Sequence, residues 1–170
     1  MGKMKILRIL AVALAACSVA SALTGDEAEV HVQAPHLDTP RPLNDTTRQA
    51  AIRDYLESWK TMTEALEQNR PALLDADFAG TAKDQLTATI QQQAALGIRT
   101  RFQPRSHTIQ IIFYSPEGLS IQLVDNIEYD VQILNKNKVL TAKQVHARYI
   151  AVLTPTEVRW RVRLFQAVSE

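Results

Sequence analysis

One acidic residue is the position in this sequence most able to carry chemistry. Asp125 lies on the apolar side of an alternating stretch, between Leu123 and Ile127. An apolar interior disfavours the charged form of a carboxylate, so a carboxylate there is suited to taking a proton from a substrate. A turn at Asp125 and Asn126, an ion pair with an arginine, or a wet end of the cavity would explain the same position. No second polar residue of known spacing accompanies it.

Five aromatic residues could line a cleft around this carboxylate. Rings that face a cavity favour a flat, apolar ligand, although aromatics at helical and strand spacing also form ordinary cores. Together with Asp125, the ligand-cleft candidates are Tyr55, Trp59, Phe113, Tyr149 and Trp160.

Arginines alternate along the last apolar stretch of the chain. Arg159, Arg161 and Arg163 share one parity, and Arg148 with His146 is expected beside them on the preceding strand. A solvated face with cross-strand ion pairs explains this pattern. An interaction face for a protein partner is the alternative, because arginine is favoured in interfaces.

Other kinds of chemistry find little support in the sequence. Residues 99–105 predict a basic connector, which could meet an anionic group but is also typical of a solvated loop. The four histidines lack metal-ligand spacing and are interpreted as surface or packing residues: His31, His36, His107 and His146. Motifs for nucleophilic, phosphoryl and hydride chemistry are missing. We therefore expect no metal and no cofactor.

The first residues predict a secretory signal peptide over 1–22. Two lysines and one arginine precede the apolar run 9–16, which is the order typical of such a signal, and the run is too short to span a bilayer. Residues 20–22 fit the general signal peptidase. Residues 14–17 resemble a lipobox, in which Cys17 would be lipidated. Either site implies a chain that is periplasmic, secreted, or lipid-anchored on the outside of the cytoplasmic or outer membrane.

Charge and cysteine content restrict the partners of the exported part. Cleavage would leave 16 of the 19 lysines and arginines against 18 acids, which changes the formal net charge from +1 to −2. No strong field remains to attract nucleic acid or an anionic membrane, so a membrane is expected to be reached only through a lipid anchor. Cys17 is the only cysteine, which excludes thiol catalysis in the domain that follows.

The elements that would position these residues begin after an expected flexible linker, residues 23–44. The linker is rich in acids and prolines, although Val30-His31-Val32 alternates like a strand. Residues 46–49 fit a capping box and predict the start of a long amphipathic helix that Pro71 ends near Asn69. Its apolar side is Ile52, Tyr55, Leu56, Trp59, Met62 and Leu66.

Two further helices are expected before the sheet. Pro71 suits the first turn of a short helix that runs to Phe78, and Thr81 can cap a third helix. Gly97 follows Leu96, where a left-handed residue would end that helix.

After these helices the apolar period changes from 3.6 to 2, and three turn signals predict four antiparallel strands. The expected strands are 105–114, 119–134, 139–153 and 158–168. Parity gives each a core face. On the second strand it is Leu119, Ile121, Leu123, Ile127, Tyr129, Val131 and Ile133, and on the fourth Val158, Trp160, Val162, Leu164 and Val168. The fold class is α+β, with three N-terminal helices packed on a strongly curved four-stranded antiparallel sheet in one domain, residues 45–170.

This order of elements resembles the nuclear transport factor two-like superfamily of cone-shaped domains. The stretches IRDYLESW, FAGTAKDQL and YIAVLTPTEVRWRVRLFQ carry the resemblance, which covers about residues 45–168. It implies a cleft between sheet and helices, used by isomerases and dehydratases and also by non-catalytic binding and assembly domains. It further implies that the open side of the sheet is a site for homodimer formation.

Fold alone does not choose among these functions. The interpretation we favour is an exported, non-catalytic ligand-binding or protein-interaction module of the bacterial cell envelope, whose partner is a small apolar ligand or an envelope protein. The alternatives are a small isomerase or dehydratase with Asp125 as general base in an aromatic cleft, and an assembly subunit of an envelope or secretion machine.

Overall fold

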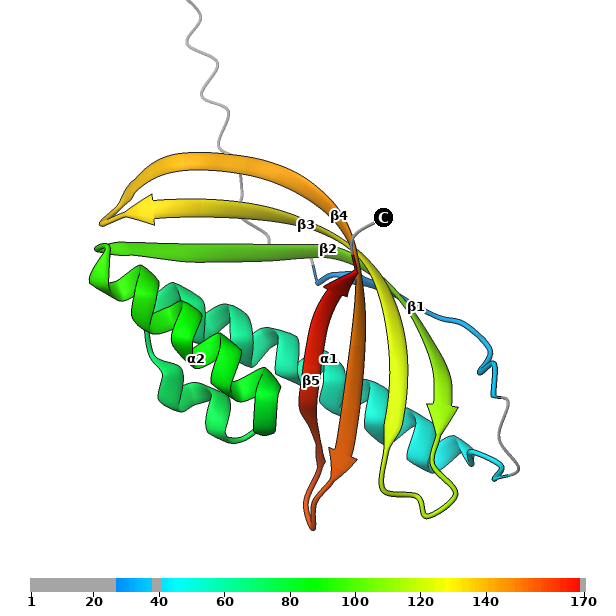
Figure 1. Cartoon of the computed structure of the whole chain (residues 1–170). Helices are drawn as coiled ribbons and strands as arrows, with labels where there is room; N and C mark the ends of the chain where they lie inside the picture. Colours follow the sequence, from blue (N-terminus) through cyan, green and yellow to red (C-terminus); the bar gives the residue numbers. More distant parts are fainter. Residues whose placement is uncertain (1–26, 38–40, 169–170) are drawn as a thin grey trace, which may run out of the picture.

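The structure is a computed structural model that describes residues 27–37 and 41–168. It is an α+β fold in which one curved sheet encloses the helices (Figure 1). In chain order the elements are β1 (Glu29–Val32), α1 (Asp45–Gln68), the 3₁₀ helix η1 (Pro71–Asp75), α2 (Gly80–Ala95), β2 (Ile98–Tyr114), β3 (Ile121–Asn135), β4 (Lys138–Pro155) and β5 (Trp160–Val168).

The long first helix forms as its apolar spacing predicts, but its cap differs. The side chain of Asn44 accepts a hydrogen bond from the backbone N–H of Thr47 at 2.8 Å, so α1 begins at Asp45 and not at a Thr46 cap. Asn69 ends the helix in a left-handed conformation. The buried side of α1 includes Tyr55 and Trp59, which therefore face the sheet.

The expected third helix is confirmed as α2, whereas the expected short second helix is only a 3₁₀ turn. η1 ends at Asp75 and not at Phe78. The reason is that residues 77–79 pair with the outer edge of β5: the N–H of Val162 donates to Asp77, and the N–H of Ala79 donates to Val162. Backbone groups engaged in this pairing cannot continue a helix. Gly97 has a positive φ of 67° directly after the cap residue Leu96, as predicted.

The sheet has five strands in the order β1-β2-β3-β4-β5, one more than predicted. Strands β2 to β5 are antiparallel neighbours, as the turns require. The extra strand, β1, lies within the expected flexible linker and pairs in parallel with residues 106–109 of β2. The linker prediction is therefore wrong for residues 29–32, whose backbone groups find partners on the sheet edge.

The prediction of a basic connector at residues 99–105 is also wrong. These residues form the first part of β2. Two of the arginines pair with acids on neighbouring elements, Arg101 with Glu67 at 2.7 Å and Arg105 with Asp130 at 2.7 Å. Positive charge that suggests a loop in the sequence here belongs to a strand with acidic neighbours.

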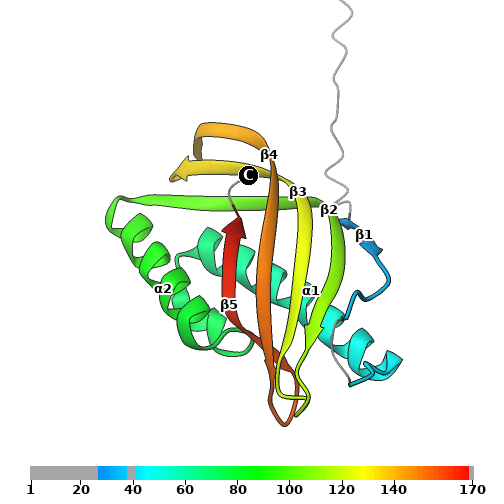
Figure 2. The same ribbon diagram turned by 45° about the vertical axis from the view of Figure 1, so that its right-hand side comes forward.

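Irregular pairing at four points accompanies the curvature of the sheet, whose strands bend around α1 (Figure 2). The pairing register shifts at Arg105 and Ile112 in β2, at Leu140 in β4 and at Arg163 in β5. An extra residue bends a strand and reverses which side chains face inward beyond it. The inward parity read from the sequence therefore fails beyond each bulge.

Most of the predicted core faces are confirmed within the regular parts of the strands. Ile121, Leu123 and Ile127 are fully buried or nearly so, and Trp160 is buried. The predictions for Leu119 and Val158 are wrong, because both precede the first paired residue of their strand and are exposed. The prediction for Val168 is also wrong, because it lies beyond the bulge at Arg163 and is exposed.

The signal peptide, the competing cleavage sites and Cys17 lie outside the described residues. Within residues 27–37 and 41–168, no helix combines the length and the apolar character that crossing a bilayer requires.

Candidate functional site

The most unusual feature of the interior is a buried hydrogen-bonded group of three polar side chains, which we call the polar centre: Tyr55, His107 and Asp125. The Tyr55 hydroxyl donates to Oδ2 of Asp125 at 3.0 Å, and Nδ1 of His107 lies 2.7 Å from the same oxygen. Asp125 and Tyr55 have no exposed surface, and His107 is 2% exposed. A polar group of this kind needs partners because burial removes its contacts with water.

Three elements bring the polar centre together. Tyr55 lies on the buried side of α1, His107 on β2 and Asp125 on β3. Asp125 is paired with Ile109 of β2, two residues beyond His107, so the imidazole and the carboxylate lie on the same inner face of the sheet. Tyr55 then reaches them from the helix that this face covers.

The hydrogen bonds in the polar centre favour one arrangement of protons. Burial, together with the neighbouring Asp125, raises the pKa of Tyr55 well above its ordinary value. The hydroxyl therefore stays protonated and donates a hydrogen bond to the carboxylate. If Asp125 is ionised it only accepts, and Nδ1 of His107 is then a donor. In the neutral imidazole, Nε2 of His107 is left as an acceptor. No described residue forms a hydrogen bond with Nε2 of His107.

Two polar atoms beside this arrangement are left over. Oδ1 of Asp125 and Nε1 of Trp59 are buried and have no hydrogen-bond partner among the described residues. Buried polar atoms in folded proteins nearly always have a partner, so an exception needs an explanation. A binding site that a ligand or water completes would supply one.

An aromatic cluster centred on Trp59 borders the polar centre. The Trp59 ring packs edge-on against His107 at 5.5 Å and against Tyr149 and Phe165 at 5.5 and 5.3 Å between ring centroids. Tyr149 and Phe165 are stacked at 4.6 Å. Trp59 thus joins the imidazole on one side to an aromatic wall on the other.

Two cavities lie on opposite sides of this cluster. The first, of about 320 Å³, is lined by Trp59 and His107 together with Ala28, Val30, Leu56, Lys60, Glu27 and Pro104. We call it the His107 cavity. The second, of about 270 Å³, includes Met62, Leu66, Leu86, Phe102, Tyr149 and Phe165 in its lining, and we call it the α2 cavity. Both are of the size and apolar character that suit small ligands or single side chains.

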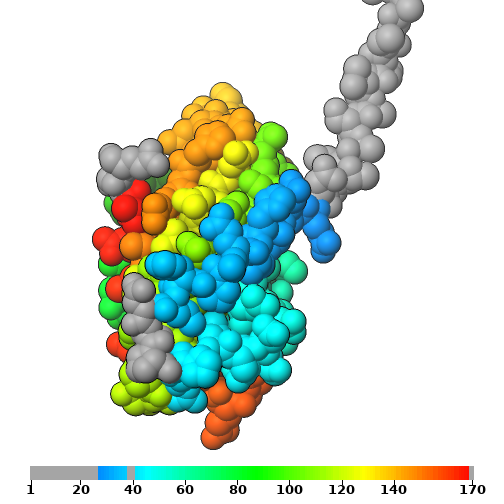
Figure 3. All heavy atoms as spheres, turned by 90° about the vertical axis from the view of Figure 1, so that its right-hand side faces the viewer, coloured from blue at the N-terminus to red at the C-terminus, as the bar shows by residue number. Residues whose placement is uncertain are grey.

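The N-terminal segment forms one wall of the His107 cavity. Ala28 and Val30 reach it from the segment that carries β1, which runs along the surface beside α1 and the strands (Figure 3). The N–H of Gln33 and that of His36 donate to carbonyls of β2 at 2.9 and 3.0 Å. Residues of this segment are therefore part of the site.

The structure brings four of the six cleft candidates together: Tyr55 and Asp125 in the polar centre, and Trp59 and Tyr149 in the aromatic cluster. The placement of Phe113 in the cleft is wrong, since the bulge at Ile112 turns its side chain outward, where it is 37% exposed. Trp160 is buried, but no ring contact between described residues joins it to Trp59 or its neighbours.

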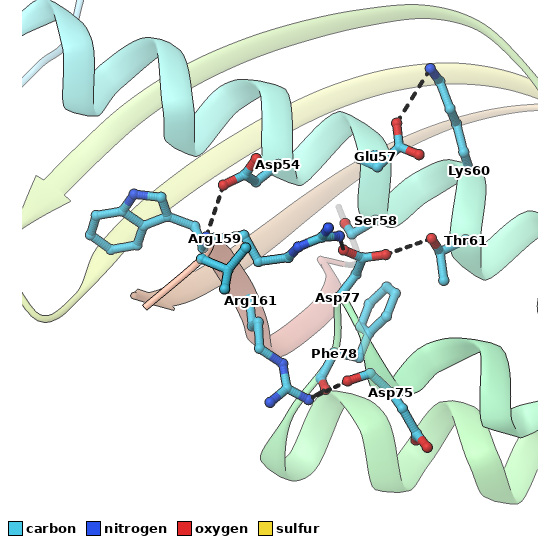
Figure 4. Close-up of polar contacts among 12 residues, drawn as sticks. Asp54, Glu57, Ser58, Lys60, Thr61, Asp75, Asp77, Phe78, Arg159 and Arg161 are labelled. Carbon is cyan, nitrogen blue, oxygen red and sulfur yellow. Dashed lines mark hydrogen bonds and ion pairs between the residues drawn. The ribbon is translucent and has the colours of Figure 1, made fainter. Parts of the chain in front are cut away.

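The four candidate arginines do not form one face. Arg159 pairs with Asp77, and Arg161 donates to the backbone carbonyls of Asp75 and Phe78 (Figure 4). The prediction of an outward row is wrong for these two, because β5 is covered at its outer edge by residues 77–79 and the guanidinium groups turn toward that segment. Arg148 and Arg163 are exposed.

Arg159 belongs to a second polar group, built around the buried Asp77, which we call the Asp77 cluster: Thr61, Asp77 and Arg159. Oδ1 of Asp77 accepts from the Arg159 guanidinium, and its Oδ2 accepts from the Thr61 hydroxyl at 2.6 Å. The hydrogen bond to Asp77 raises the pKa of Arg159 above its ordinary value. These contacts tie β5 to α1 and to the segment that follows η1 (Figure 4).

The sequence reasoning missed His107, which it treated as a surface or packing residue. The signal was available, because His107 shares its parity with Ile109 and Ile111, both of which are buried. Had that parity been applied, His107 would have been placed on the same inner face as Asp125. Among the described residues, no group of three or more potential metal ligands lies close enough to hold an ion.

Helices that pack on the inner face of a bent sheet give this chain a cone-shaped α+β fold, similar to that of nuclear transport factor two-like domains. Structures of known proteins agree. The intermembrane space region of the chloroplast protein ARC6 superimposes with a TM-score of 0.63 at 10% identity, over 76% of this chain and 100% of that one.

A scytalone dehydratase-like protein from Novosphingobium aromaticivorans superimposes with a TM-score of 0.51 at 11% identity, over 74% of this chain and 89% of that one. No family model and no curated protein sequence matches the chain. At these identities the likeness establishes the fold and nothing further.

Proposed function

We propose that this domain binds a small molecule with a flat, apolar body and one hydrogen-bonding group, in the His107 cavity. The observation that carries the proposal is that His107 is held at Nδ1 by Asp125 and lines a cavity beside the ring of Trp59. A fixed imidazole offers one directed acceptor, and the indole offers an apolar surface.

The unpartnered polar atoms support a binding role. Trp59 lines the His107 cavity and its Nε1 has no partner among the described residues, so a ligand or water bound there would supply one. The hydrogen bond from Tyr55 keeps the carboxylate in place, so the imidazole does not need to reorganise on binding.

Nuclear magnetic resonance tests this proposal directly. Phenol, indole and 2-naphthol are added to the isotope-labelled domain, and the indole N–H signal of Trp59 is followed, with Trp160→Phe used to assign it. At least one of the three probes is expected to shift the Trp59 signal. Leu56→Trp, which fills the His107 cavity, should abolish the shift, and the exposed control Leu119→Trp should not. No shift with any probe would remove the proposed ligand site.

Catalysis is the second candidate function, and the hydrogen bonds of the polar centre are the reason to retain it. Asp125 is fully enclosed, and both of its hydrogen bonds converge on Oδ2. In an isomerase or dehydratase built on this site, His107 would therefore exchange the proton with the substrate and Asp125 would position it. Removal of a proton from a carbon next to a carbonyl is a step that such isomerases and dehydratases share, so it is the step to test first.

Proton exchange separates this candidate from simple binding. Enzyme-dependent exchange of deuterium into the α-carbon of 1-tetralone, lost in His107→Gln, would support catalysis. Binding of the aromatic probes without any exchange would leave ligand binding as the function.

For location, we propose export to the cell envelope, on the basis of the N-terminal sequence pattern. If Cys17 carries a lipid, Cys17→Ser should move the chain from the membrane fraction to the soluble envelope fraction. Unchanged fractionation would remove the lipid anchor from the proposal. Retention of both forms in the cytoplasm would remove export as well.

A further inference from the structure

The outer end of the sheet carries a long strand edge that no described residue covers. β4 runs from Lys138 to Pro155, but β5 pairs with it only between Arg148 and Pro155. Residues 138–147, which we call the open edge, are paired on one side with β3 and on the other with no described strand. Figure 1 shows this part of β4 running beyond the end of β5.

The open edge is accessible as well as unpaired. Residues 138–144 are all exposed, including the apolar side chains of Val139 (45%) and Leu140 (53%). An exposed strand edge presents unpaired N–H and C=O groups in a row, and an extended peptide can bind them by adding a strand. Between the bulge at Leu140 and the first residue paired with β5, residues 141–147 therefore offer the backbone half of a peptide-binding site.

The α2 cavity begins just beyond the open edge, since Tyr149 lines it and none of residues 138–147 does. Tyr149 follows the open edge on β4, and Phe165 lies on β5 opposite Ala151, near the point where β5 ends. Both rings line the cavity, as does Phe102 of β2. A strand added along residues 138–147 would continue the position of β5, so its inward side chains would point toward this apolar cavity.

Charge selects the kind of partner. Residues 131–148 contain four lysines and arginines and no aspartate or glutamate: Lys136, Lys138, Lys143 and Arg148. None of these four forms an ion pair with a described residue. An acidic segment would neutralise them, whereas two copies of this edge side by side would bring like charges together.

We propose that the open edge binds an extended, acidic segment of a partner protein, which adds a strand beside β4 and places an apolar side chain in the α2 cavity. The lysines that disfavour pairing of two identical edges favour this partner. The site is separate from the His107 cavity and does not depend on the ligand proposed there.

Fluorescence anisotropy with a short synthetic peptide tests the inference. The probe alternates glutamate with valine and phenylalanine, and a matched peptide carries lysine in place of glutamate. We expect a dissociation constant of about tens of micromolar for the acidic probe and no measurable binding of the basic one. The double variant Lys138→Glu/Lys143→Glu should raise the dissociation constant of the acidic probe at least about tenfold. The control Arg48→Glu/Arg70→Glu, which makes the same charge change near the two ends of α1, should not.

Backbone amide shifts locate the bound peptide. The proposal predicts that the acidic probe shifts the amide signals of residues 138–147 and the side-chain signals of the residues that line the α2 cavity. Shifts confined to other elements, equal binding of both peptides, or no binding would overturn it. Dimer formation through this edge would also overturn it. In that case the free domain would sediment as a dimer, and the amide signals of residues 138–147 would change on dilution without peptide.

Discussion

Two buried carboxylates in this domain are treated in opposite ways. In the Asp77 cluster, each carboxylate oxygen has its own partner, a guanidinium on one side and a hydroxyl on the other. In the polar centre, both contacts fall on Oδ2 of Asp125, and Oδ1 has no partner among the described residues. Asp77 joins three segments of the chain, whereas Asp125 positions a histidine at a cavity.

The difference shows which of the two carboxylates serves the fold. A fully paired buried carboxylate is costly to disturb because its partners are then left without compensation. An incompletely paired one contributes less to stability and is retained for another reason, which here is the orientation of His107. The following substitutions separate the two cases by their effects on unfolding and on ligand binding.

The largest effect is expected at Asp77. Asp77→Ala removes the acceptor for Arg159 and Thr61, and with it one of the links between α1 and the start of β5, so the free energy of unfolding should fall by about 3 kcal/mol. Urea denaturation measures it. The matched control is Asp75→Ala, which breaks an exposed pair with Lys83 and should cost less than about 1 kcal/mol. Equal losses in the two variants would contradict a structural role that is specific to Asp77.

Tyr55→Phe should have the next largest effect, about 2 kcal/mol at neutral pH, because Asp125 loses a buried donor. The pKa of Tyr55 is raised in the folded state, so the contribution of its neutral hydroxyl is complete below the unfolded pKa of about 10 and is lost as pH rises further. Urea denaturation at several alkaline pH values should therefore show a steeper loss of stability in the wild type than in Tyr55→Phe. The same dependence of stability on pH in both proteins would mean that the pKa of Tyr55 is not raised by folding.

Thr61→Val removes one hydroxyl from the Asp77 cluster while keeping the shape of the side chain. Its Oγ1 donates to Asp77 at 2.6 Å, so the free energy of unfolding should fall by about 1 kcal/mol. Because threonine does not titrate, the alkaline slope should match that of the wild type. A change in ligand binding would show that the two polar groups are coupled, contrary to the separation argued here.

Asp125→Asn should have the smallest effect on stability and a large effect on the site. The amide oxygen can accept from Tyr55 and His107, and its N–H₂ replaces the oxygen that has no partner, so the free energy of unfolding should stay within about 1 kcal/mol. The Trp59 signal should nevertheless lose its response to the aromatic probes, since an amide fixes the imidazole less strongly than a carboxylate does. A fall of several kcal/mol in the free energy of unfolding would show that Asp125, like Asp77, is a structural residue.

The sequence predicted the parts of this molecule that depend on local periodicity. The buried side of α1, the order of the antiparallel strands and the inward position of Asp125 follow from spacings of 3.6 and 2. Phe113 was misplaced because the bulge at Ile112 depends on how neighbouring strands fit around the helix, and no local residue type marks it.

Long-range contacts were beyond the reach of the sequence pattern. β1 forms because a distant strand offers an edge, and Arg159 turns away from the outer face because Asp77 lies beside it in space. His107 is different, since it shares the parity of Ile109 and Ile111, and its inward position could have been predicted from that pattern. The pairing of His107 with Asp125, and the two cavities on either side of Trp59, required the folded arrangement.

The tautomer of His107 tests the central claim most directly. Long-range proton–nitrogen correlation spectra of the labelled domain should show Nδ1 protonated and Nε2 as an unprotonated acceptor whose nitrogen signal moves when a bound probe donates to it. This result would place an oriented acceptor at the cavity. A ring protonated at Nε2 alone, or an Nε2 signal that does not change while a probe shifts the Trp59 indole, would contradict the account.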